Sequence, residues 1–385
     1  MRKLLGIMLL LPLFAGCGAG ESVSVSEDRE APTVYIQEAE QLYPEGQEGY
    51  VPLNYRETAG KWFPYMGYED YMTGKSEEDF RLAVRELYSE AKAEGINTLY
   101  LHVHPCGDAY YRSDIFPQGE CLDGDYDPLE IMLAEAHSLG MSAHAWLNPL
   151  RCQSSEQMDR LSGDFIVKRW VDDESCHIAK LVGGRWYLDP SYIETDKLLC
   201  RCITELTERY DVDGIQIDDY FYPTADESFD HEEFLASGAQ DLAQWRLGNC
   251  SRMVRAMYEA VKKCNRRVEF GISPQGSLTG NYESQYADVR LWCREKSYCD
   301  YIVPQLYFGF ENEICPFAET FALWESLVCP DVRLIAGLAP YKLGKADKWA
   351  GAAGENEWLK SQDIIERQIV LVKESKVASG YALYG

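Results

Sequence analysis

The sequence predicts an α/β fold, a (β/α)8 TIM barrel with loop insertions at its C-terminal face, over residues 59–385. From Lys61 onward, short β-branched or aromatic runs alternate with helical patterns, which is typical of parallel βα units. Eight such runs can be counted, the number that closes this barrel. The chain has no GxGxxG fingerprint, so an open doubly wound sheet is less favoured.

The eight runs are expected to be the barrel strands in chain order. They are Trp62 to Tyr68, Thr98 to His104, Met141 to Asn148, Gly214 to Asp218, Val268 to Ser273, Tyr301 to Tyr307, Arg333 to Leu338 and Tyr381 to Tyr384. Capping signals mark helices between them. Ser76-x-x-Asp79 predicts a helix over 80–94, Asp127-Pro128 predicts one that ends at Gly140, and Asp189-Pro190 predicts one that runs to Tyr210.

Residues 1–17 are predicted to direct export. Two basic residues precede an apolar run from Leu4 to Phe14 that is too short to span a bilayer as a helix. The Phe-Ala-Gly-Cys17 ending is similar to a bacterial lipobox, so we expect residues 1–16 to be a lipoprotein signal peptide and Cys17 to carry the lipid. An ordinary cleaved signal is the alternative. Residues 17–58, rich in Ser, Glu, Gln and Pro, predict a flexible tether.

The amino-acid composition argues against nucleic acid and a structural metal as binding partners. With 37 Lys and Arg against 63 Asp and Glu, the net charge is -26 over 385 residues, which argues against binding nucleic acid by neutralising phosphates. Without Cys17, twelve of the 13 cysteines remain. They show no CxxC pair, so no metal site is expected. We expect mostly small buried thiols, with a few disulfides as the alternative.

Strand parity predicts which side chains face the barrel interior. Apolar residues of one parity should face the helices, which leaves the other parity inward. The inward side chains are then His102, His104, His144, Trp146, Asn148, Gln216, Asp218, Gln305 and Tyr307. Aromatic faces stack on sugar rings and amides bond hydroxyls, so this set favours a carbohydrate pocket. For His102 and His144, a role as hydrogen-bonded core residues is the alternative.

The densest motif runs from Tyr210 to Pro223, where two carboxylates end a strand and three aromatic residues follow them. This pattern suits hydrolysis of a glycosidic bond, in which one carboxylate must stay ionised while aromatic rings hold the sugar. Asp218 is our candidate nucleophile or general base. Asp219 has outward parity, so it either turns in as the strand ends or orients its neighbour.

A second carboxylate must come from a loop. Asp108, in the loop after the second strand, is the first candidate. The other candidates are Glu69, Asp70, Glu283, Glu311 and Glu313. For substrate binding we select His102, His104, His144, Trp146, Asn148, Tyr220, Tyr222, Gln305 and Tyr307. Arg151 either pairs with a substrate carboxylate, such as a muramic-type lactyl group, or holds Asp218 by a salt bridge.

Motifs along most of the barrel carry a family resemblance. They are His104-Pro-x-Gly-Asp-Ala-Tyr-Tyr-x-Ser113, Tyr126-Asp-Pro-Leu129, Glu135-Ala-His137, His144-Ala-Trp-x-Asn-Pro149, Arg151, Asp211-Val-Asp-Gly214, Asp218-Asp-Tyr-Phe-Tyr-Pro223, Phe270-Gly-Ile-Ser-Pro274 and Asp300-Tyr-Ile-x-Pro-Gln305. In this the chain resembles the bacterial glycosyl-hydrolase-like family 10 of TIM-barrel proteins. The resemblance implies an exported or envelope-bound glycosidase of cell-wall or other polysaccharide glycan, with the carboxylate after the fourth strand at its centre.

Two other classes of function stay open at this point. A glycan-binding lipoprotein without catalysis would use the same aromatic and amide rim. A metal-dependent hydrolase would use His102, His104 and Asp218 as ligands. For the glycosidase we expect a glycan partner, membrane contact through the lipid anchor only, no nucleic acid and no cofactor.

Overall fold

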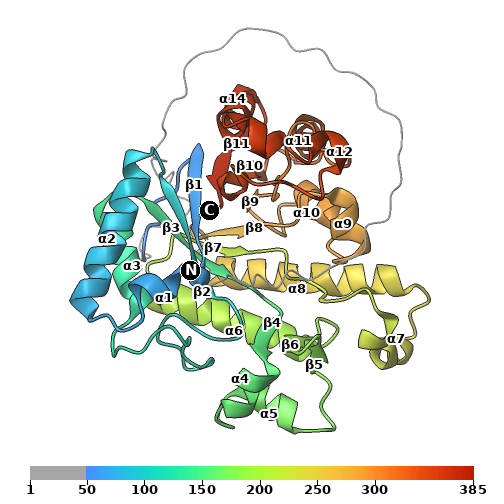
Figure 1. The fold of residues 1–385 in the computed structure, drawn as a ribbon. Helices are drawn as coiled ribbons and strands as arrows, with labels where there is room; N and C mark the ends of the chain where they lie inside the picture. Colours follow the sequence, from blue (N-terminus) through green and yellow to red (C-terminus); the bar gives the residue numbers. More distant parts are fainter. Residues whose placement is uncertain (1–48) are drawn as a thin grey trace. The chain divides into compact units, whose positions relative to one another are not determined.

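In the computed structural model, residues 49–385 are described, and they form a closed barrel of eight parallel strands (Figure 1). The predicted fold class is confirmed. Neighbouring strands follow the order β1-β11-β10-β9-β8-β7-β3-β2. Their bounds are β1 Thr58–Phe63, β2 Thr98–His104, β3 Ser142–Leu147, β7 Gly214–Ile217, β8 Glu269–Ile272, β9 Tyr301–Ile302, β10 Arg333–Leu338 and β11 Ala378–Leu383. The predicted signal peptide 1–16, the lipidation site Cys17 and most of the predicted tether lie outside the described residues.

Two strands differ from their predicted bounds because of proline. The first was expected over 62–68, but β1 ends at Phe63, and Pro64 precedes a short 3-10 helix, η1 (Tyr65–Gly67). The sixth was expected over 301–307, but β9 ends at Ile302, shortly before Pro304. Proline has no N–H to donate to a strand ladder, so regular pairing stops beside it.

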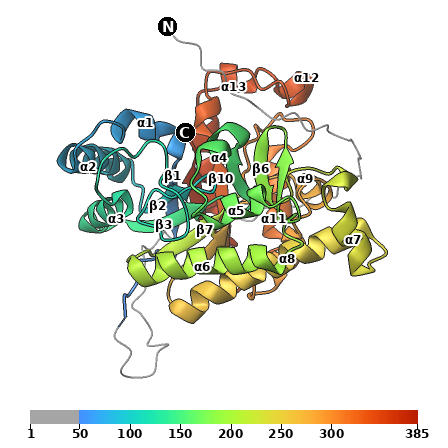
Figure 2. The same ribbon diagram turned by 90° about the horizontal axis from the view of Figure 1, so that it is seen from below.

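Helices connect most of the strands and cover the outside of the barrel. Their bounds are α1 Tyr68–Tyr71, α2 Glu77–Ala93, α3 Pro128–Ser138, α4 Ser155–Arg160, α5 Ile166–Asp172, α6 Ile193–Arg209, α7 His231–Ser237, α8 Leu242–Cys264, α9 Leu278–Glu283, α10 Val289–Arg294, α11 Phe317–Glu325, α12 Gly351–Gly354, α13 Glu357–Lys360 and α14 Ile364–Glu374, with 3-10 turns η2 Glu227–Phe229 and η3 Pro340–Lys342. The predicted caps are present, since the Ser76 hydroxyl accepts from Asp79 N and the Asp127 carboxylate accepts from Leu129 N. Helices α6 and α8 lie side by side in both ribbon views (Figures 1 and 2).

The largest insertion follows β3 and carries a sheet of its own. Strands β4 (Arg151–Ser154), β6 (Arg185–Leu188) and β5 (Ala179–Val182) pair antiparallel in that order. Together with α4 and α5, this small sheet stands beyond the end of β3 (Figure 1). An insertion at this place follows the carboxyl end of a barrel strand, so it lies on the face that bears active sites in this architecture.

Aromatic side chains fill the barrel interior. Trp62, Tyr100, Trp146 and Tyr301 are buried there against three small or branched residues. Trp62 Nε1 donates to Gln216 Oε1 at 2.6 Å across the interior, from β1 to β7. A barrel interior filled for stability alone would mainly use aliphatic side chains, so the aromatic and polar side chains in this interior indicate a further role.

The end of the predicted tether is packed on the barrel. Residues 50–55 lie at the amino ends of the strands, where Tyr50 Oη and Leu53 N donate to Asp213 Oδ1 at 2.6 and 2.5 Å. Asn54 Nδ2 donates to the Asp213 carbonyl, and Tyr55 Oη donates to the Gly140 carbonyl. The predicted boundary at residue 58 was therefore too late, because composition does not register hydrogen bonds made to a distant part of the chain.

All twelve cysteines in residues 49–385 are free thiols. Six are buried, six are half-buried, and none is exposed. This agrees with thiols that serve as small apolar side chains, and burial raises the pKa of several, such as that of Cys202, to about 12.

Candidate active site

Asp218 lies at the carboxyl end of β7, as strand parity predicted. Its side chain is buried and faces the barrel interior. Trp146 Nε1, from β3, donates to Oδ2 at 2.9 Å, and the backbone N–H of Tyr220 donates to Oδ1 at 3.3 Å. Both donors stabilise the carboxylate in one orientation, toward the rim where a substrate would arrive.

Asp219 also faces this rim, although its parity pointed outward. Strand β7 ends at Ile217, so the alternation of side chains does not continue to Asp219. Gln305 Nε2 donates to Asp219 Oδ1 at 3.2 Å and to the Ser273 carbonyl at 3.1 Å. Of the two alternatives predicted for Asp219, the structure shows the first, in which the side chain turns inward where the strand ends.

Burial and mutual repulsion disfavour ionisation of the two adjacent carboxyl groups. Burial raises the pKa of Asp218 well above its ordinary value, and the negative charge of Asp219 raises it further. Burial also raises the pKa of Asp219, against side-chain hydrogen bonds from Gln305 and Gln275 that lower it. The pair therefore releases its two protons in separate steps and can hold one proton while bearing one charge.

Asp108 supplies a third carboxyl group near the same rim. It lies in the loop after β2, where its Oδ1 accepts from Cys106 N at 2.8 Å. Burial raises the pKa of Asp108 to about 6. The charge of Arg151 lowers the pKa of each of Asp108, Asp218 and Asp219, so the guanidinium lies within electrostatic reach of all three. The other candidate acids, Glu69, Asp70, Glu283, Glu311 and Glu313, are exposed surface residues.

Arg151 is a cation without an ion-pair partner among residues 49–385. It is the first residue of β4, and its guanidinium lies 4.9 Å from the ring centroid of Tyr220. Its Nε is buried and has no hydrogen-bond acceptor in the described part of the chain. No Asp or Glu oxygen of residues 49–385 lies within 4.0 Å of it, so the predicted alternative of a salt bridge to Asp218 is wrong.

His102 and Asn148 support the rim from inside the barrel. The His102 ring stacks on Trp146, with centroids 3.6 Å apart and planes at 10°, and its Nε2 donates to Asn148 Oδ1 at 3.1 Å. Asn148 Nδ2 donates to the Pro105 carbonyl at 2.9 Å. Burial lowers the pKa of His102 well below its ordinary value, so the ring is neutral. Asn148 thus fixes His102, His102 stacks on Trp146, and Trp146 donates to Asp218.

Two of the predicted substrate-binding residues lie away from the rim that carries Asp218. His144 sits near the amino end of β3, bonded to Tyr301 Oη at 2.7 Å and Asn54 Oδ1 at 3.0 Å. Tyr222 is buried behind the rim, with the Arg246 guanidinium 5.2 Å from its ring. For His144 the structure shows the alternative, a hydrogen-bonded core residue, because parity gives the side of a strand and not the height along it. Tyr222, selected from the motif that follows the strand, lies away from the rim because loop contacts set its direction.

His104 is likewise a buried support. Its Nδ1 donates to the Asp108 carbonyl at 2.7 Å, and its ring packs 4.3 Å from that of Phe116. Burial lowers its pKa to about 4. Within residues 49–385, no three His, Cys, Asp or Glu side chains converge closely enough to hold a metal ion, so His102, His104 and Asp218 do not form the metal site of that alternative.

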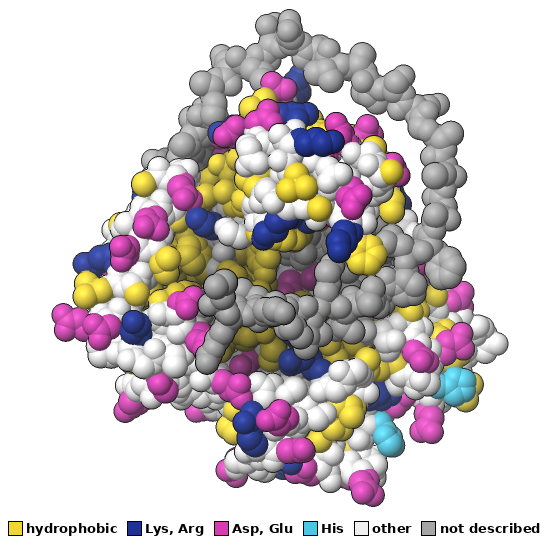
Figure 3. Space-filling model, in the orientation of Figure 1, with side chains coloured by type: hydrophobic (Ala, Val, Ile, Leu, Met, Phe, Trp, Pro, Cys, Tyr) yellow, Lys and Arg dark blue, Asp and Glu magenta, His cyan; other side chains and the backbone are white. Residues whose placement is uncertain are grey.

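An aromatic wall that sequence reasoning only partly found lines the opposite part of the rim. The predicted Tyr307 stacks on Tyr384, with centroids 5.9 Å apart, and Tyr341 packs edge-on against both. Tyr384 shares the inward parity of Ala382 in β11, and this parity is the sequence signal that indicates it. Hydrophobic side chains gather in a hollow near the C-terminus and the end of β1 (Figure 3). Such a wall can stack on sugar rings.

Comparisons with known proteins agree with this geometry. A family model described as Glycosyl hydrolase-like 10 matches residues 71–352. The chain is 31% identical over 311 residues to glycosyl hydrolase DigH of Escherichia coli K12, covering 70% of this chain and 69% of that protein. It is 28% identical over 319 residues to glycosyl hydrolase YngK of Bacillus subtilis strain 168, covering 75% of this chain and 61% of that protein.

Solved structures are similar in fold at low identity. The PgaB (BpsB) glycoside hydrolase domain from Bordetella bronchiseptica superimposes with a TM-score of 0.56 at 13% identity, covering 86% of this chain and 94% of that one. Alpha-L-fucosidase isoenzyme 2 from Paenibacillus thiaminolyticus gives 0.54 at 11% identity, covering 85% and 46%. At these identities the likeness shows the barrel fold alone.

Proposed function

The chain belongs to the glycosyl hydrolase-like 10 family, and we propose that it cleaves a bacterial cell-wall glycan by acid–base chemistry centred on Asp218. The family assignment makes it a glycoside hydrolase. The observation that supports the finer proposal is the buried Asp218 beside the half-buried Asp219 at the carboxyl end of β7, facing an aromatic rim.

Hydrolysis of a glycosidic bond needs one ionised carboxylate and one carboxylic acid. We assign the ionised role, nucleophile or general base, to Asp218, because Trp146 Nε1 and Tyr220 N donate to its oxygens and, with the charge of Arg151, lower its pKa against the burial that raises it. When Asp219 holds a proton, its charge no longer raises the pKa of Asp218. The acid is Asp219, which is coupled to Asp218, or Asp108, whose pKa burial raises to about 6. A raised pKa keeps a carboxyl protonated closer to neutral pH, as a general acid requires.

Arg151 supports an anionic sugar as part of the substrate. Its guanidinium has no carboxylate partner among residues 49–385, and Arg forms strong bidentate pairs with carboxylates. A muramic-type unit carries a lactyl carboxylate, which is free in strands that lack stem peptides. We therefore propose peptide-free peptidoglycan strands as the preferred substrate.

Placement at the cell envelope is part of the same proposal. It is supported by the basic residues, apolar run and lipobox-like ending that lead to Cys17. Among the described residues, no helix is both long and apolar enough to cross a membrane. A lipid on Cys17 would hold the enzyme at the membrane whose wall it cleaves.

The substrate proposal is tested by release of reducing ends. The full-length chain in detergent is incubated with peptide-free strands, with peptide-bearing strands, and with peptide-free strands whose carboxyl groups have been reduced to alcohols. We expect the fastest release from the first. Arg151→Gln should lower kcat/KM on charged strands by about tenfold and have little effect on reduced strands. Equal loss on both substrates would contradict a carboxylate contact, and no release from any strand would refute the wall glycan as substrate.

A further inference from the structure

A second arginine lies beside Arg151 on the small sheet. Arg185 is the first residue of β6, and Tyr187, two residues later in the same strand, pairs with Arg151 of β4. Residues that pair directly, and residues two apart in one strand, present their side chains on the same face. Arg151 and Arg185 are therefore diagonal neighbours, with Cα atoms about 7 to 8 Å apart, a distance that two arginine side chains can bridge.

The Arg185 guanidinium reaches back across β4 toward Arg151. Its Nη1 donates to the Cys152 carbonyl at 2.6 Å, and Cys152 directly follows Arg151 in the chain. Within residues 49–385, this carbonyl is the one acceptor that the Arg185 side chain has, and no Asp or Glu oxygen lies within 4.0 Å of it. Both arginines are half-buried, so a ligand can still reach them.

The ionisable side chains that share both arginines as neighbours are neutral. Burial raises the pKa of Tyr65, Tyr187 and Cys106, and the charges of Arg151 and Arg185 each act in the opposite direction on all three. Because burial prevails, the two hydroxyls and the thiol carry no charge at neutral pH. The two guanidiniums therefore repel each other, and none of these three neighbours offsets that repulsion.

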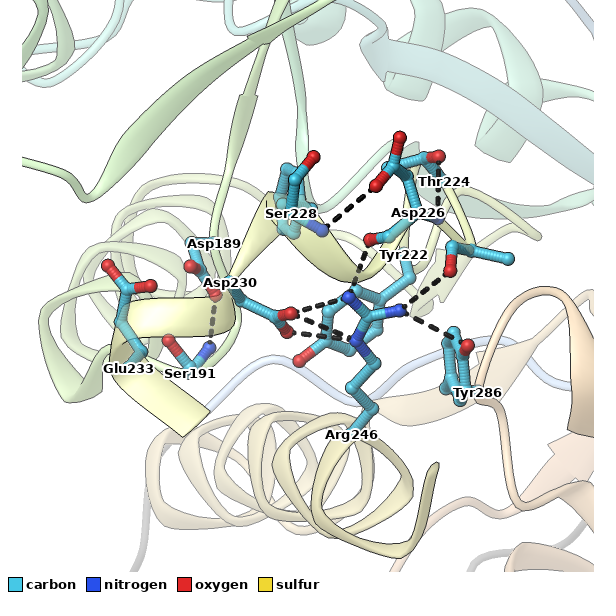
Figure 4. A network of polar contacts seen from close by, with 12 residues as sticks. Asp189, Ser191, Tyr222, Thr224, Asp226, Ser228, Asp230, Glu233, Arg246 and Tyr286 are labelled. Carbon is cyan, nitrogen blue, oxygen red and sulfur yellow. Dashed lines mark hydrogen bonds and ion pairs between the residues drawn. The ribbon is translucent and has the colours of Figure 1, made fainter. Parts of the chain in front are cut away.

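Other cations beside the small sheet have acidic partners. Arg246, completely buried behind the loop that follows β7, pairs with Asp230 (Figure 4). Lys180 of β5 pairs with Asp189 and Glu233, each at 2.8 Å. In a chain with a net charge of -26, acidic partners are abundant. Two neighbouring arginines that pair with none of them in the described part of the chain indicate that a ligand supplies the negative charge.

The two arginines border the rim that carries the catalytic carboxyl groups. The Arg151 guanidinium lies 4.9 Å from the ring centroid of Tyr220, which is 37% exposed and closely follows Asp218. Tyr65, half-buried, packs edge-on against His102 with ring centroids 5.3 Å apart, and His102 belongs to the stack that positions Asp218. An anion between the two guanidiniums would thus belong to a substrate unit that lies over the same rim.

We propose that Arg151 and Arg185 together hold one carboxylate of the substrate, which makes Arg185 a specificity-determining residue for an anionic sugar unit. This inference rests on the proposed function, because it takes the carboxylate to be that of the muramic-type unit. A carboxylate has about four lone-pair sites on its two oxygens, enough to accept from two guanidiniums. A neutral sugar in the same place would leave both charges without a partner, so it is selected against.

Binding measurements in an inactive background test the two-arginine site apart from catalysis. Full-length Asp218→Asn protein in detergent is titrated calorimetrically with peptide-free wall tetrasaccharides and with the same tetrasaccharides after reduction of their carboxyl groups to alcohols. Arg185→Gln and Arg151→Gln are added to this background singly and together. Arg160→Gln is the matched control, since Arg160 is an exposed residue of α4 in the same insertion and pairs with Glu120. Thermal unfolding shows whether each variant is folded.

We expect Arg185→Gln to lower the affinity for the charged tetrasaccharide about tenfold and that for the reduced one less than about twofold, while Arg160→Gln changes neither. The double variant should lose less than the product of the two single losses, because both arginines contact the same group. The Asp218→Asn protein itself should prefer the charged tetrasaccharide about 100-fold. A preference below about tenfold would overturn the two-arginine site even if Arg185→Gln does not fold.

Three other results would also overturn the site. They are an equal loss on charged and reduced tetrasaccharides, an equal loss in Arg160→Gln, and a loss in Arg151→Gln without one in Arg185→Gln. The last result would leave the single contact of the proposed function intact. Failure of the proposed function has a different signature, since the unaltered chain would then cleave no wall strand or would cleave it without Asp218, whatever the arginine variants bind.

Discussion

Replacing Asp213 by Asn should destabilise the barrel from the face opposite the candidate active site. Asp213 is completely buried and accepts four hydrogen bonds. Oδ1 accepts from Tyr50 Oη and Leu53 N, and Oδ2 accepts from Ala143 N at 2.7 Å and from His137 Nε2 at 2.9 Å. Each carboxylate oxygen therefore serves one backbone N–H, and a backbone N–H cannot become an acceptor.

An asparagine in this place has one oxygen and one NH2 group. Whichever way it is oriented, the backbone N–H of Leu53 or of Ala143 faces a donor and stays unsatisfied, at a cost of about 2 kcal/mol. The remaining bonds lose the assistance of the negative charge, about 1 kcal/mol more. Over the 337 residues from 49 to 385, the total of about 3 kcal/mol corresponds to a fall in Tm of about 4 °C.

Thermal unfolding followed by circular dichroism measures this fall in the full-length chain. Asp211→Asn, an exposed position two residues earlier, is the matched control and should leave Tm within about 1 °C. A fall of less than about 1 °C for Asp213→Asn would refute the reasoning. It would mean that residues 50–55 do not hold Asp213 as the contacts indicate.

The remaining predictions concern the pH dependence of glycan hydrolysis. With Asp108 as the acid, Asp219→Asn removes the charge that raises the pKa of Asp218, so the acid limb of kcat/KM should move to lower pH, whereas Trp146→Phe removes a donor to the carboxylate and should move it to higher pH. Shifts in the same direction would contradict the coupling described for this pair. With its pKa raised to about 6, Asp108 as the acid predicts that kcat/KM declines as the pH rises through 6, and that Asp108→Asn abolishes this limb. An unchanged alkaline limb in that variant would assign the proton to Asp219.

Much of the fold was predictable from the sequence because period-2 and helical patterns are local. The bounds of β2 and β10 agree with the predicted runs residue for residue. The small sheet β4-β6-β5 was missed, because its strands are four residues each and too short to show a pattern. The packing of residues 50–55 was missed since their partners lie far away in the chain.

For the candidate site, strand parity predicted the direction of side chains correctly within a strand and incorrectly beyond the end of a strand. Trp146 and Asp218 were both expected to face inward, and they are joined by a hydrogen bond. His144 has the same parity as Trp146 but lies near the opposite end of the barrel, which parity does not report. Asp219 and Tyr222 follow the end of β7, where loop contacts determine direction.

The most direct test of the central claim compares Asp218→Asn with the unaltered chain on peptide-free wall strands. Because the substitution keeps the size of the side chain, binding of the strands should stay within about threefold while kcat/KM falls by at least about 10³-fold. An Asp218→Asn protein that keeps more than about a tenth of the kcat/KM would contradict a catalytic centre at Asp218.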